Sequence, residues 1–320
     1  MKIVVLDSYT TNPGDLSWDF LKKYSDDIVI YDRTSKENIV SRAKGAEILI
    51  VNKTVLDEKI LNKLSPELKY IGLQSTGYNI IDLAAAKKNG VTVCNIPSYS
   101  TNAVAQLVFS FILQFTNRVN LHSESVYNGD WCNCPDFCYW KSPLTELNGK
   151  TIGIIGFGSI GKRVAEIAEV FGMKILLNSK SKKDISEFKH ASQVDLDRLF
   201  KESDFITCHC PLTKETIGLI NKNNLLKMKK TAILINTSRG PVVNEYDLAQ
   251  ALNNNIIAGA GLDVLETEPP NVDNPLLKAK NCYITPHIAW AARETRARLI
   301  SILDKNIEKF LSGNAQNKVN

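Results

Sequence analysis

Short apolar segments alternate with longer polar ones through the first third of the chain. The apolar segments are rich in β-branched residues, and the polar stretches between them suit helices. This alternation is typical of βαβ units, in which the strands form a parallel sheet. The predicted strands of this part are 3–6, 28–31, 48–51, 70–73 and 91–93.

The same alternation returns after residue 150 and predicts a second sheet. Helical intervals separate its apolar segments, which suits a doubly wound nucleotide-binding domain. A long amphipathic helix is expected at 294–311, and the tail from residue 312 is expected to be frayed. The predicted strands of this second sheet are 152–155, 174–178, 205–208, 232–235, 258–262 and 283–285.

Two segments between these halves break the pattern. Residues 101–115 form a helix that is apolar over most of its circumference, so it must be buried. It lies either in a core between the two halves or against a second subunit. Residues 121–148 show no periodicity and are rich in Cys, Trp and Asn, which predicts a long loop outside the scaffold.

A glycine-rich turn joins the first strand of the second half to a helix. The stretch TIGIIGFGSIG at 151–161 places Gly156, Gly158 and Gly161 in the G-x-G-x-x-G spacing. These glycines permit a tight turn, a close approach of the pyrophosphate, and close packing of helix on strand. The N–H groups of Ser159 and Ile160, at the positive end of the helix dipole, are then expected to bind the phosphates of a dinucleotide.

The composition is that of a globular protein and argues against a membrane-spanning or nucleic-acid-binding protein. The chain has 320 residues, enough for two domains, with 44% apolar and 23% charged residues and a net charge of +5. It has no apolar run of ~18 residues, so no membrane span is expected. Acidic residues are mixed with the basic ones, which argues against a nucleic-acid surface.

The seven cysteines point to a reducing compartment. The N-terminus reads as a first strand rather than a secretory signal, so a cytoplasmic protein with free thiols is expected. The spacings of Cys132, Cys134 and Cys138, and of Cys208 and Cys210, match no standard zinc pattern, so no metal site is predicted.

Several further motifs follow the glycine turn in order, and together they are more specific than the glycines alone. They are HCPLT at 209–213, NTSRG at 236–240, Asp263-Val264 followed by Glu268-Pro269, and TPH at 285–287. With these motifs the chain resembles the D-isomer-specific 2-hydroxyacid dehydrogenases over nearly its full length. A narrower resemblance to the glycerate dehydrogenases of that family rests on 12–18, 75–79, 99–101, 136–140 and 287–290.

The resemblance implies an α/β fold with two Rossmann-like, doubly wound parallel-sheet domains. A discontinuous substrate domain would comprise residues 1–99 and 289–320, and a dinucleotide-binding domain residues 100–288, with the active site in the cleft between them. Family members are usually dimers, so a homodimer is expected. The implied reaction is hydride transfer between a nicotinamide cofactor and a small 2-keto acid.

The narrower resemblance favours reduction of hydroxypyruvate to D-glycerate, with glyoxylate as a further substrate. Two alternatives stay open: a D-lactate-type dehydrogenase of another 2-keto acid, and a non-catalytic, dinucleotide-sensing protein like the corepressors of this fold. Substrate choice would rest on the pocket wall, for which Tyr78, Trp140 and Trp290 are the candidates.

Three residues are predicted to be catalytic. His287 follows a proline at a strand end and suits a proton donor, because histidine titrates near neutral pH. Glu268 is expected to hydrogen-bond His287. Arg239 follows a strand directly, and its planar guanidinium matches a carboxylate in a bidentate fashion.

The resemblance also implies the remaining contacts. The substrate carboxylate would be bound by Arg239 together with backbone N–H groups of Ser75, Thr76 and Gly77, and His287 would face the reacting carbonyl. The cofactor would contact the glycine turn and a set of residues from the strand ends, with Asp263 accepting a hydrogen bond from the carboxamide. That set is Thr101, Ser179, Lys180, Cys210, Pro211, Thr237, Ser238, Arg239, Asp263 and His287.

One position departs from the NAD-dependent pattern. The acid that binds the adenosine ribose, ~20 residues past the glycines, is replaced by Ser179, and Lys180, Lys182 and Lys183 follow. Without the acid a 2′-phosphate is not repelled, and lysines attract one. We therefore expect use of NADP(H), alone or alongside NAD(H). The alternative is a solvated basic loop, with NAD(H) bound through Asn178 and Ser179.

Overall fold

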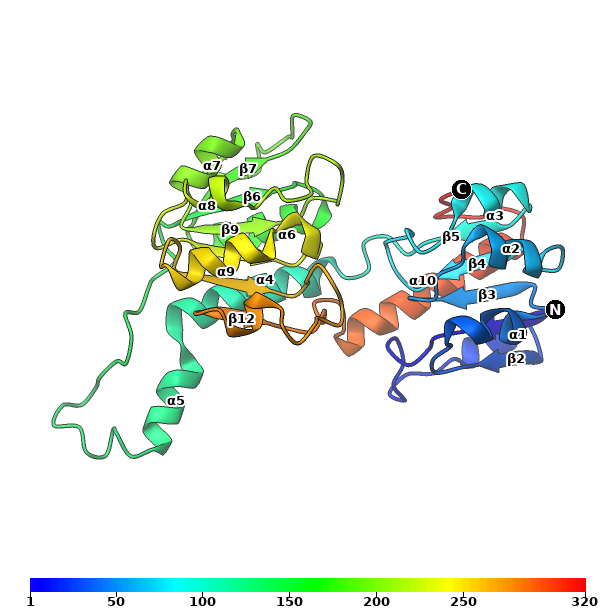
Figure 1. Cartoon of the computed structure of the whole chain (residues 1–320), viewed down its shortest axis with the longest axis horizontal. Helices are drawn as coiled ribbons and strands as arrows, with labels where there is room; N and C mark the ends of the chain where they lie inside the picture. Colours follow the sequence, from blue (N-terminus) through cyan, green and yellow to red (C-terminus); the bar gives the residue numbers. More distant parts are fainter. The chain divides into compact units, whose positions relative to one another are not determined.

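The computed structural model describes residues 1–320 and divides them into two compact units (Figure 1). Unit 1 comprises Met1–Ser100 and Trp290–Asn320, and unit 2 comprises Thr101–Ala289. Each limit differs by one residue from the expected domain limits. The chain therefore leaves unit 1 once and returns to it with its C-terminal helix.

Unit 1 is built on a five-stranded parallel sheet in the order β2-β1-β3-β4-β5. Its strands are buried on both faces, which is why they read as continuous apolar runs. Helices α1, α2 and α3 cover one face, packing on Val4 and Leu49, while α10 covers the other, packing on Ile3 and Ile48. The strands are β1 (Lys2–Val5), β2 (Asp27–Ile30), β3 (Ile48–Val51), β4 (Tyr70–Leu73) and β5 (Thr92–Cys94), and the helices are α1 (Ile39–Ala43), α2 (Glu58–Leu64), α3 (Leu83–Lys88), α10 (Arg293–Leu311) and the 3-10 turns η1 (Asp19–Lys23) and η2 (Lys36–Asn38).

The C-terminal tail is not frayed, so that prediction was wrong. The tail pairs with the edge of β5: the Val319 N–H donates to the carbonyl of Val93 at 2.9 Å, and the Asn95 N–H donates to Asn317 at 3.1 Å. The Asn320 side chain accepts from the Val93 N–H at 3.0 Å. An open strand edge offers unpaired backbone groups to any nearby segment, and hydrophobic periodicity carries no sign of this.

Unit 2 is a seven-stranded parallel sheet in the order β12-β11-β10-β9-β6-β7-β8. Helices α4 and α6 cover one face, and α7, α8 and α9 cover the other (Figure 1). The strands are β6 (Thr151–Ile155), β7 (Lys174–Asn178), β8 (Ala191–Gln193), β9 (Phe205–Cys208), β10 (Ile233–Asn236), β11 (Gly259–Leu262) and β12 (Cys282–Ile284), and the helices are α4 (Thr101–Asn117), α5 (Val119–Tyr127), α6 (Ser159–Val170), α7 (Leu196–Glu202), α8 (Lys222–Leu225), α9 (Glu245–Asn253) and the 3-10 turns η3 (Gly240–Val242) and η4 (Pro275–Lys278).

The predicted fold class, two doubly wound parallel sheets, is confirmed. Every predicted strand is present, with limits that differ by at most one residue. The sequence missed β8, because the edge strand Ala191–Gln193 is short and carries no apolar run. No helix is both long and apolar enough to cross a membrane.

Helix α4 is buried in the core of unit 2, which neither alternative from the sequence described. Phe111 and Phe115 pack on Gly261 and Gly259 of β11, where a Cβ atom would collide with the rings. The Phe115 and Tyr283 ring centroids lie 4.9 Å apart. Glycines in the strand thus make room for a large aromatic layer under this helix.

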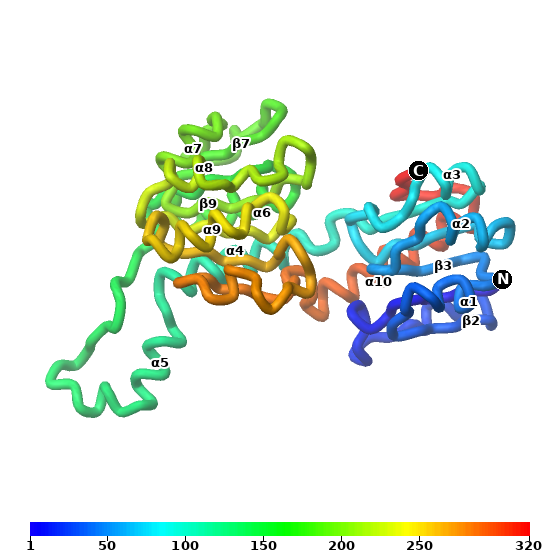
Figure 2. Tube along the Cα trace, viewed as in Figure 1, coloured from blue at the N-terminus to red at the C-terminus, as the bar shows by residue number.

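The segment after α4 is partly helical rather than a continuous loop. Helix α5 begins after Arg118, whose φ of +46° turns the chain, and a loop over 128–150 leads back to β6. The helix and its loop stand away from the remainder of unit 2 (Figures 1 and 2). Helix α5 has no apolar stripe in its sequence. Val119 and Tyr127 are exposed, so no face of the helix is packed against a core that would require one.

Candidate active site

The glycine turn after β6 has the geometry that a dinucleotide requires. Gly156 has a φ of +94°, and a Cβ atom there would lie 2.6 Å from the backbone of His209 and Cys210. A Cβ atom on Gly161 would collide with the Gly156 carbonyl, whereas Gly158 faces open space. Two glycines thus permit close packing of the chain, and the third leaves the approach to the turn clear.

The start of α6 is open to an anion. Gly158 is the residue before the helix, and no side chain caps the first N–H groups, which belong to Ser159, Ile160 and Gly161. Uncapped N–H groups at the N-terminus of a twelve-residue helix suit a phosphate. The residues present therefore fit a pyrophosphate group.

The carboxyl end of β7 carries Ser179 and Lys180 in a loop without a free acid. The Gln193 side chain shapes this loop, donating to the Ser179 carbonyl at 3.2 Å and accepting from the Lys183 N–H at 2.9 Å. The exposed Lys180 ammonium lies 3.5 Å from the Glu215 carboxylate. The loop is thus basic at 180–183 and held at its base by Gln193.

The backbone of His209 and Cys210, directly after β9, lies behind the glycine turn. Burial lowers the pKa of His209 to about 3, and its Nε2 lies 2.9 Å from the Thr207 hydroxyl. Burial also raises the pKa of the Cys208 and Cys210 thiols, so both stay protonated and unreactive. Pro211 follows and is exposed. No group of three or more His, Cys, Asp or Glu side chains is arranged to hold a metal ion.

A tight turn after β10 presents Arg239. The Asn236 side chain closes this turn, donating to the Arg239 carbonyl at 2.9 Å and accepting from the N–H and hydroxyl of Ser238 at 3.0 and 2.8 Å. The exposed guanidinium donates to the Ser238 carbonyl and pairs with no carboxylate within 4.0 Å. The Thr237 hydroxyl is buried without a partner. The Arg239 guanidinium is therefore available to a ligand.

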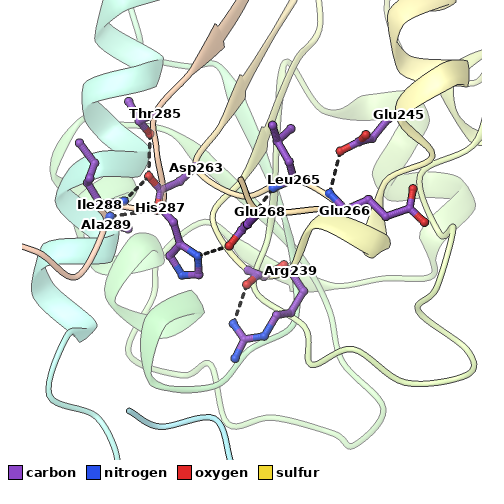
Figure 3. A network of polar contacts seen from close by, with 11 residues as sticks. Arg239, Glu245, Asp263, Leu265, Glu266, Glu268, Thr285, His287, Ile288 and Ala289 are labelled. Atoms are coloured by element: carbon purple, nitrogen blue, oxygen red, sulfur yellow. Dashed lines mark hydrogen bonds and ion pairs between the residues drawn. The ribbon is translucent and has the colours of Figure 1, made fainter. Parts of the chain in front are cut away.

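His287 and Glu268 form a close pair (Figure 3). The His287 Nδ1 lies 2.6 Å from Glu268 Oε2, and the other carboxylate oxygen accepts from the Leu265 N–H at 3.1 Å. The predicted hydrogen bond between the two side chains is thus present. With Nδ1 occupied, Nε2 is the ring nitrogen that can exchange a proton with a substrate.

Asp263 holds the turn on which His287 sits. Its carboxylate, 1% exposed, accepts from the Thr285 hydroxyl at 2.6 Å and from the N–H groups of Ile288 and Ala289 at 2.8 and 2.9 Å. The Asp263 carbonyl accepts from the His287 N–H at 2.9 Å, and His287 adopts a φ of +54°. The expected contact of Asp263 with a carboxamide stays a prediction beside this observed role.

The turn of Arg239 packs directly on the segment that leads to Glu268. A Cβ atom on Gly240 would collide with the Leu265 carbonyl and the Glu266 nitrogen, so only glycine fits there. Arg239, Glu268 and His287 therefore gather at the carboxyl ends of β10, β11 and β12 (Figure 3). Ligands of doubly wound sheets bind outside these strand ends.

The other predicted substrate contacts lie in unit 1, after β4. The Ser75 hydroxyl donates to the Gly77 carbonyl at 2.6 Å, and the Thr76 hydroxyl donates to Ile96 at 2.7 Å, which fixes the loop's shape. Thr101 is the first residue of α4 in unit 2.

The sequence analysis did not identify Asn236 as a residue that shapes the site. An Asn two residues before a Ser at a strand end is nevertheless a recognisable side-chain turn.

Sequence comparison with known proteins identifies relatives that are 2-hydroxyacid dehydrogenases. The model of the D-isomer specific 2-hydroxyacid dehydrogenase NAD binding domain matches residues 109–289. The chain is 46% identical to a hydroxypyruvate reductase of Blautia hydrogenotrophica, with both chains covered in full. It is 39% identical to a glycerate dehydrogenase of Methylorubrum extorquens, over 99% of this chain and 98% of that one.

A solved structure of a related protein has a similar fold over the whole chain. An acyclic imino acid reductase, Bsp5, in complex with NADPH and D-Arg superposes with a TM-score of 0.86 at 34% identity, and both chains are covered in full. The glycine turn, the Glu268–His287 pair and the unpaired Arg239 thus occur in a chain whose relatives are nicotinamide-dependent oxidoreductases. The chain belongs to the D-isomer-specific 2-hydroxyacid dehydrogenase family.

Proposed function

We propose that this enzyme reduces hydroxypyruvate to D-glycerate, and glyoxylate to glycolate, with a reduced nicotinamide cofactor. The observation that carries the proposal is the Glu268–His287 pair beside a guanidinium that has no acidic partner. The names of the two relatives described above favour hydroxypyruvate over pyruvate as the substrate.

In the proposed reaction Arg239 binds the substrate carboxylate through two parallel hydrogen bonds. When bound, the reduced nicotinamide supplies the hydride that C2 of the keto acid receives. His287 donates the Nε2 proton to the C2 oxygen as negative charge develops there. Glu268 holds the imidazole by Nδ1, which leaves Nε2 free to face the substrate.

A second set of contacts is proposed for the substrate. Backbone N–H groups of Ser75, Thr76 and Gly77 would bind the carboxylate together with Arg239. Tyr78, which follows this loop and is 45% exposed, would contribute to the pocket wall. Replacing Tyr78 with Phe or Ala should alter the ratio of kcat/KM for hydroxypyruvate and pyruvate if this assignment holds.

For the cofactor we propose that NADP(H) is used, alone or alongside NAD(H). The support is Ser179 at the end of β7, with Lys180 beside it and no acid within the loop 179–183. Ser179→Asp would restore the ribose-binding acid, so it should raise the preference for NADH by tenfold or more. A wild-type preference for NADH of a hundredfold or more would rule the proposal out.

We also propose that the enzyme is a cytoplasmic homodimer. Residues 119–144, called the α5 segment, comprise α5 and part of the loop after it and expose eight large apolar side chains that a second copy would cover. All seven cysteines are free, as expected in a reducing compartment. The exposed side chains of this segment are Val119, Leu121, Val126, Tyr127, Trp131, Phe137, Trp140 and Leu144.

The test is a panel of substrates and cofactors. Hydroxypyruvate, glyoxylate and pyruvate are each incubated with the enzyme and NADPH or NADH, and nicotinamide absorbance is followed. We expect the highest kcat/KM with hydroxypyruvate. Faster turnover of pyruvate would favour a D-lactate-type enzyme, and no turnover of any keto acid would favour a dinucleotide-sensing binding protein.

A further inference from the structure

The segment that carries Glu268 is exposed to solvent along its whole length. All residues of 266–273 are exposed, whereas Leu265 before it and Leu276 after it are buried. An exposed loop of this length has little packing to fix its shape. Glu268 nevertheless has to meet His287 at a hydrogen-bond distance, so something else must hold the loop.

One side chain ties the two ends of this loop together. Glu245 is the first residue of α9, and its Oε1 accepts from the Glu266 N–H at 2.7 Å (Figure 3). Its Oε2 accepts from the side-chain amide of Asn274, also at 2.7 Å. Asn274 in turn caps η4, accepting from the Leu276 N–H at 3.0 Å. A single carboxylate thus joins the start of the loop to its buried end.

The same anchor reaches the catalytic pair through two adjacent backbone groups. The Glu266 N–H is bound by Glu245, and the N–H of the preceding Leu265 binds Glu268 Oε1. Glu268 Oε2 then meets His287. Gly240 packs against the same 265–266 peptide. A shift of this peptide would therefore move Glu268 relative to His287.

We propose that Glu245 is a positioning residue for the reaction, acting through the loop 266–274 on Glu268. It touches neither His287 nor Arg239. The inference rests on the proposed function only for its kinetic consequence, because the anchoring of the loop can be measured without turnover. Charge-assisted hydrogen bonds to backbone N–H groups are short and strong, which suits this task.

The start of α9 does not depend on Glu245, so its substitution should leave the helix folded. Asn244 caps the helix, accepting from the Asp247 N–H at 3.0 Å. Glu245→Ala removes both hydrogen bonds to the loop. Glu245→Gln keeps an acceptor for the Glu266 N–H but directs an amide NH₂ toward that of Asn274, so it should retain part of the function.

The experiment compares these two variants with a matched control. Asp273→Ala removes one exposed carboxylate from the same loop, and Asp273 makes none of the anchoring hydrogen bonds. Each change is also made in a Glu268→Gln background. Steady-state kinetics with hydroxypyruvate gives kcat and KM, and hydrogen–deuterium exchange measures the protection of the amides of residues 264–274.

We expect Glu245→Ala to lower kcat by about tenfold to a hundredfold, because a small misplacement of a catalytic group costs about that much. Glu245→Gln should lose less, and Asp273→Ala less than about twofold. In the Glu268→Gln background Glu245→Ala should have almost no further effect, since residues that act as one unit are not additive. Amide exchange in 264–274 should accelerate most in Glu245→Ala, less in Glu245→Gln, and not in Asp273→Ala.

Two results would overturn the proposal. One is unchanged exchange of the 264–274 amides in Glu245→Ala, which would show that the carboxylate does not anchor the loop. The other is an equal loss of kcat from Glu245→Ala in the wild-type and the Glu268→Gln backgrounds, which would assign Glu245 a separate role. A wild-type enzyme inactive on every keto acid would instead refute the proposed function, and the exchange data would still decide the anchoring.

Discussion

Arg239 and His287 are presented to solvent by residues that are themselves buried. Asn236 and Asp263 are 0% and 1% exposed, and each accepts or donates three hydrogen bonds to the turn beside it. Buried polar groups of this kind must be fully paired, because an unpaired one is costly. The backbone turns therefore position Arg239 and His287, and the Arg239 side chain stays exposed and able to bind an anion.

The planar guanidinium of Arg239 should matter beyond its charge. Arg239→Lys keeps the charge but loses the second of two parallel hydrogen bonds to the substrate carboxylate. A hydrogen bond to a charged group contributes about 1.5–3 kcal/mol, so kcat/KM for hydroxypyruvate should fall by about tenfold to a hundredfold. The KM for the cofactor serves as the control, and an unchanged kcat/KM would show that Arg239 does not bind the carboxylate.

His209 makes stability depend on pH. Its pKa of about 3 in the fold lies below the ordinary value near 6.5, because burial disfavours the charged ring. Below pH 6.5 the unfolded chain therefore takes up a proton that the folded chain does not. Between pH 7 and pH 5 this should lower the free energy of unfolding by about 2 kcal/mol.

The check is denaturant unfolding of the wild type and of His209→Asn at both pH values. Asparagine does not titrate, so the variant should lose about 2 kcal/mol less on acidification, whatever its absolute stability. Equal losses in the two proteins would show that His209 takes up its proton at the same pH in the folded and the unfolded chain.

At the scale of elements, turns at the strand ends carry the residues of the site, and the sheet fixes where these turns lie. The glycine turn, the Asn236 turn and the Asp263 turn follow three strands of one parallel sheet. Their positions follow from the topology, since the carboxyl ends of parallel strands share one edge. Changes within these turns should therefore alter chemistry with little effect on the rest of unit 2.

The anchored tail predicts a stability effect far from these turns. Deleting residues 317–320 removes four hydrogen bonds: the N–H groups of Asn95 and Val93 donate to Asn317 and Asn320, and Val319 and Asn320 donate to the carbonyls of Val93 and Val91. At about 0.5–1.5 kcal/mol for each hydrogen bond, the loss should be about 2–6 kcal/mol. A thermal unfolding scan measures it, and a Tm equal to that of the full chain would mean that the tail is detached in solution.

The strands could be predicted because both faces of each sheet are buried, so the strand sequences are runs of apolar residues. The long helices could be predicted from their apolar positions. Arg239, Glu268 and His287 could be found because each stands in a motif after a strand. Glu245 could not, because its partners are a backbone N–H and an amide that lie far along the chain. The tail and β8 escaped for a similar reason: edge pairing leaves no periodic pattern.

At the scale of the whole molecule, the chain crosses from unit 1 to unit 2 and returns for α10, so unit 1 is not a continuous segment. In unit 1, α10 places Leu299, Leu303 and Ile307 on the sheet and completes its core. The α5 segment, by contrast, contributes few side chains to any core within unit 2. Eight large apolar side chains of this segment lie exposed on its surface.

That surface makes the oligomeric state testable. Tyr127, 89% exposed, can be changed to Glu without disturbing a core. If a second copy covers α5, the buried charge should be costly, and Tyr127→Glu should shift a dimer toward a monomer. Sedimentation velocity of the two proteins at equal concentration decides the matter, and Lys305→Glu, on the exposed side of α10, serves as the control. A wild-type monomer would contradict the proposed dimer.

In the proposed reaction His287, held in place by Glu268, protonates the C2 oxygen of a 2-keto acid that Arg239 binds. The most direct measurement is the turnover of hydroxypyruvate by the wild type and by His287→Asn, with the chirality of the glycerate determined. We predict D-glycerate from the wild type and a kcat lower by about a hundredfold or more in the variant, with cofactor affinity retained. A kcat in His287→Asn equal to that of the wild type, or L-glycerate as the product, would contradict the account.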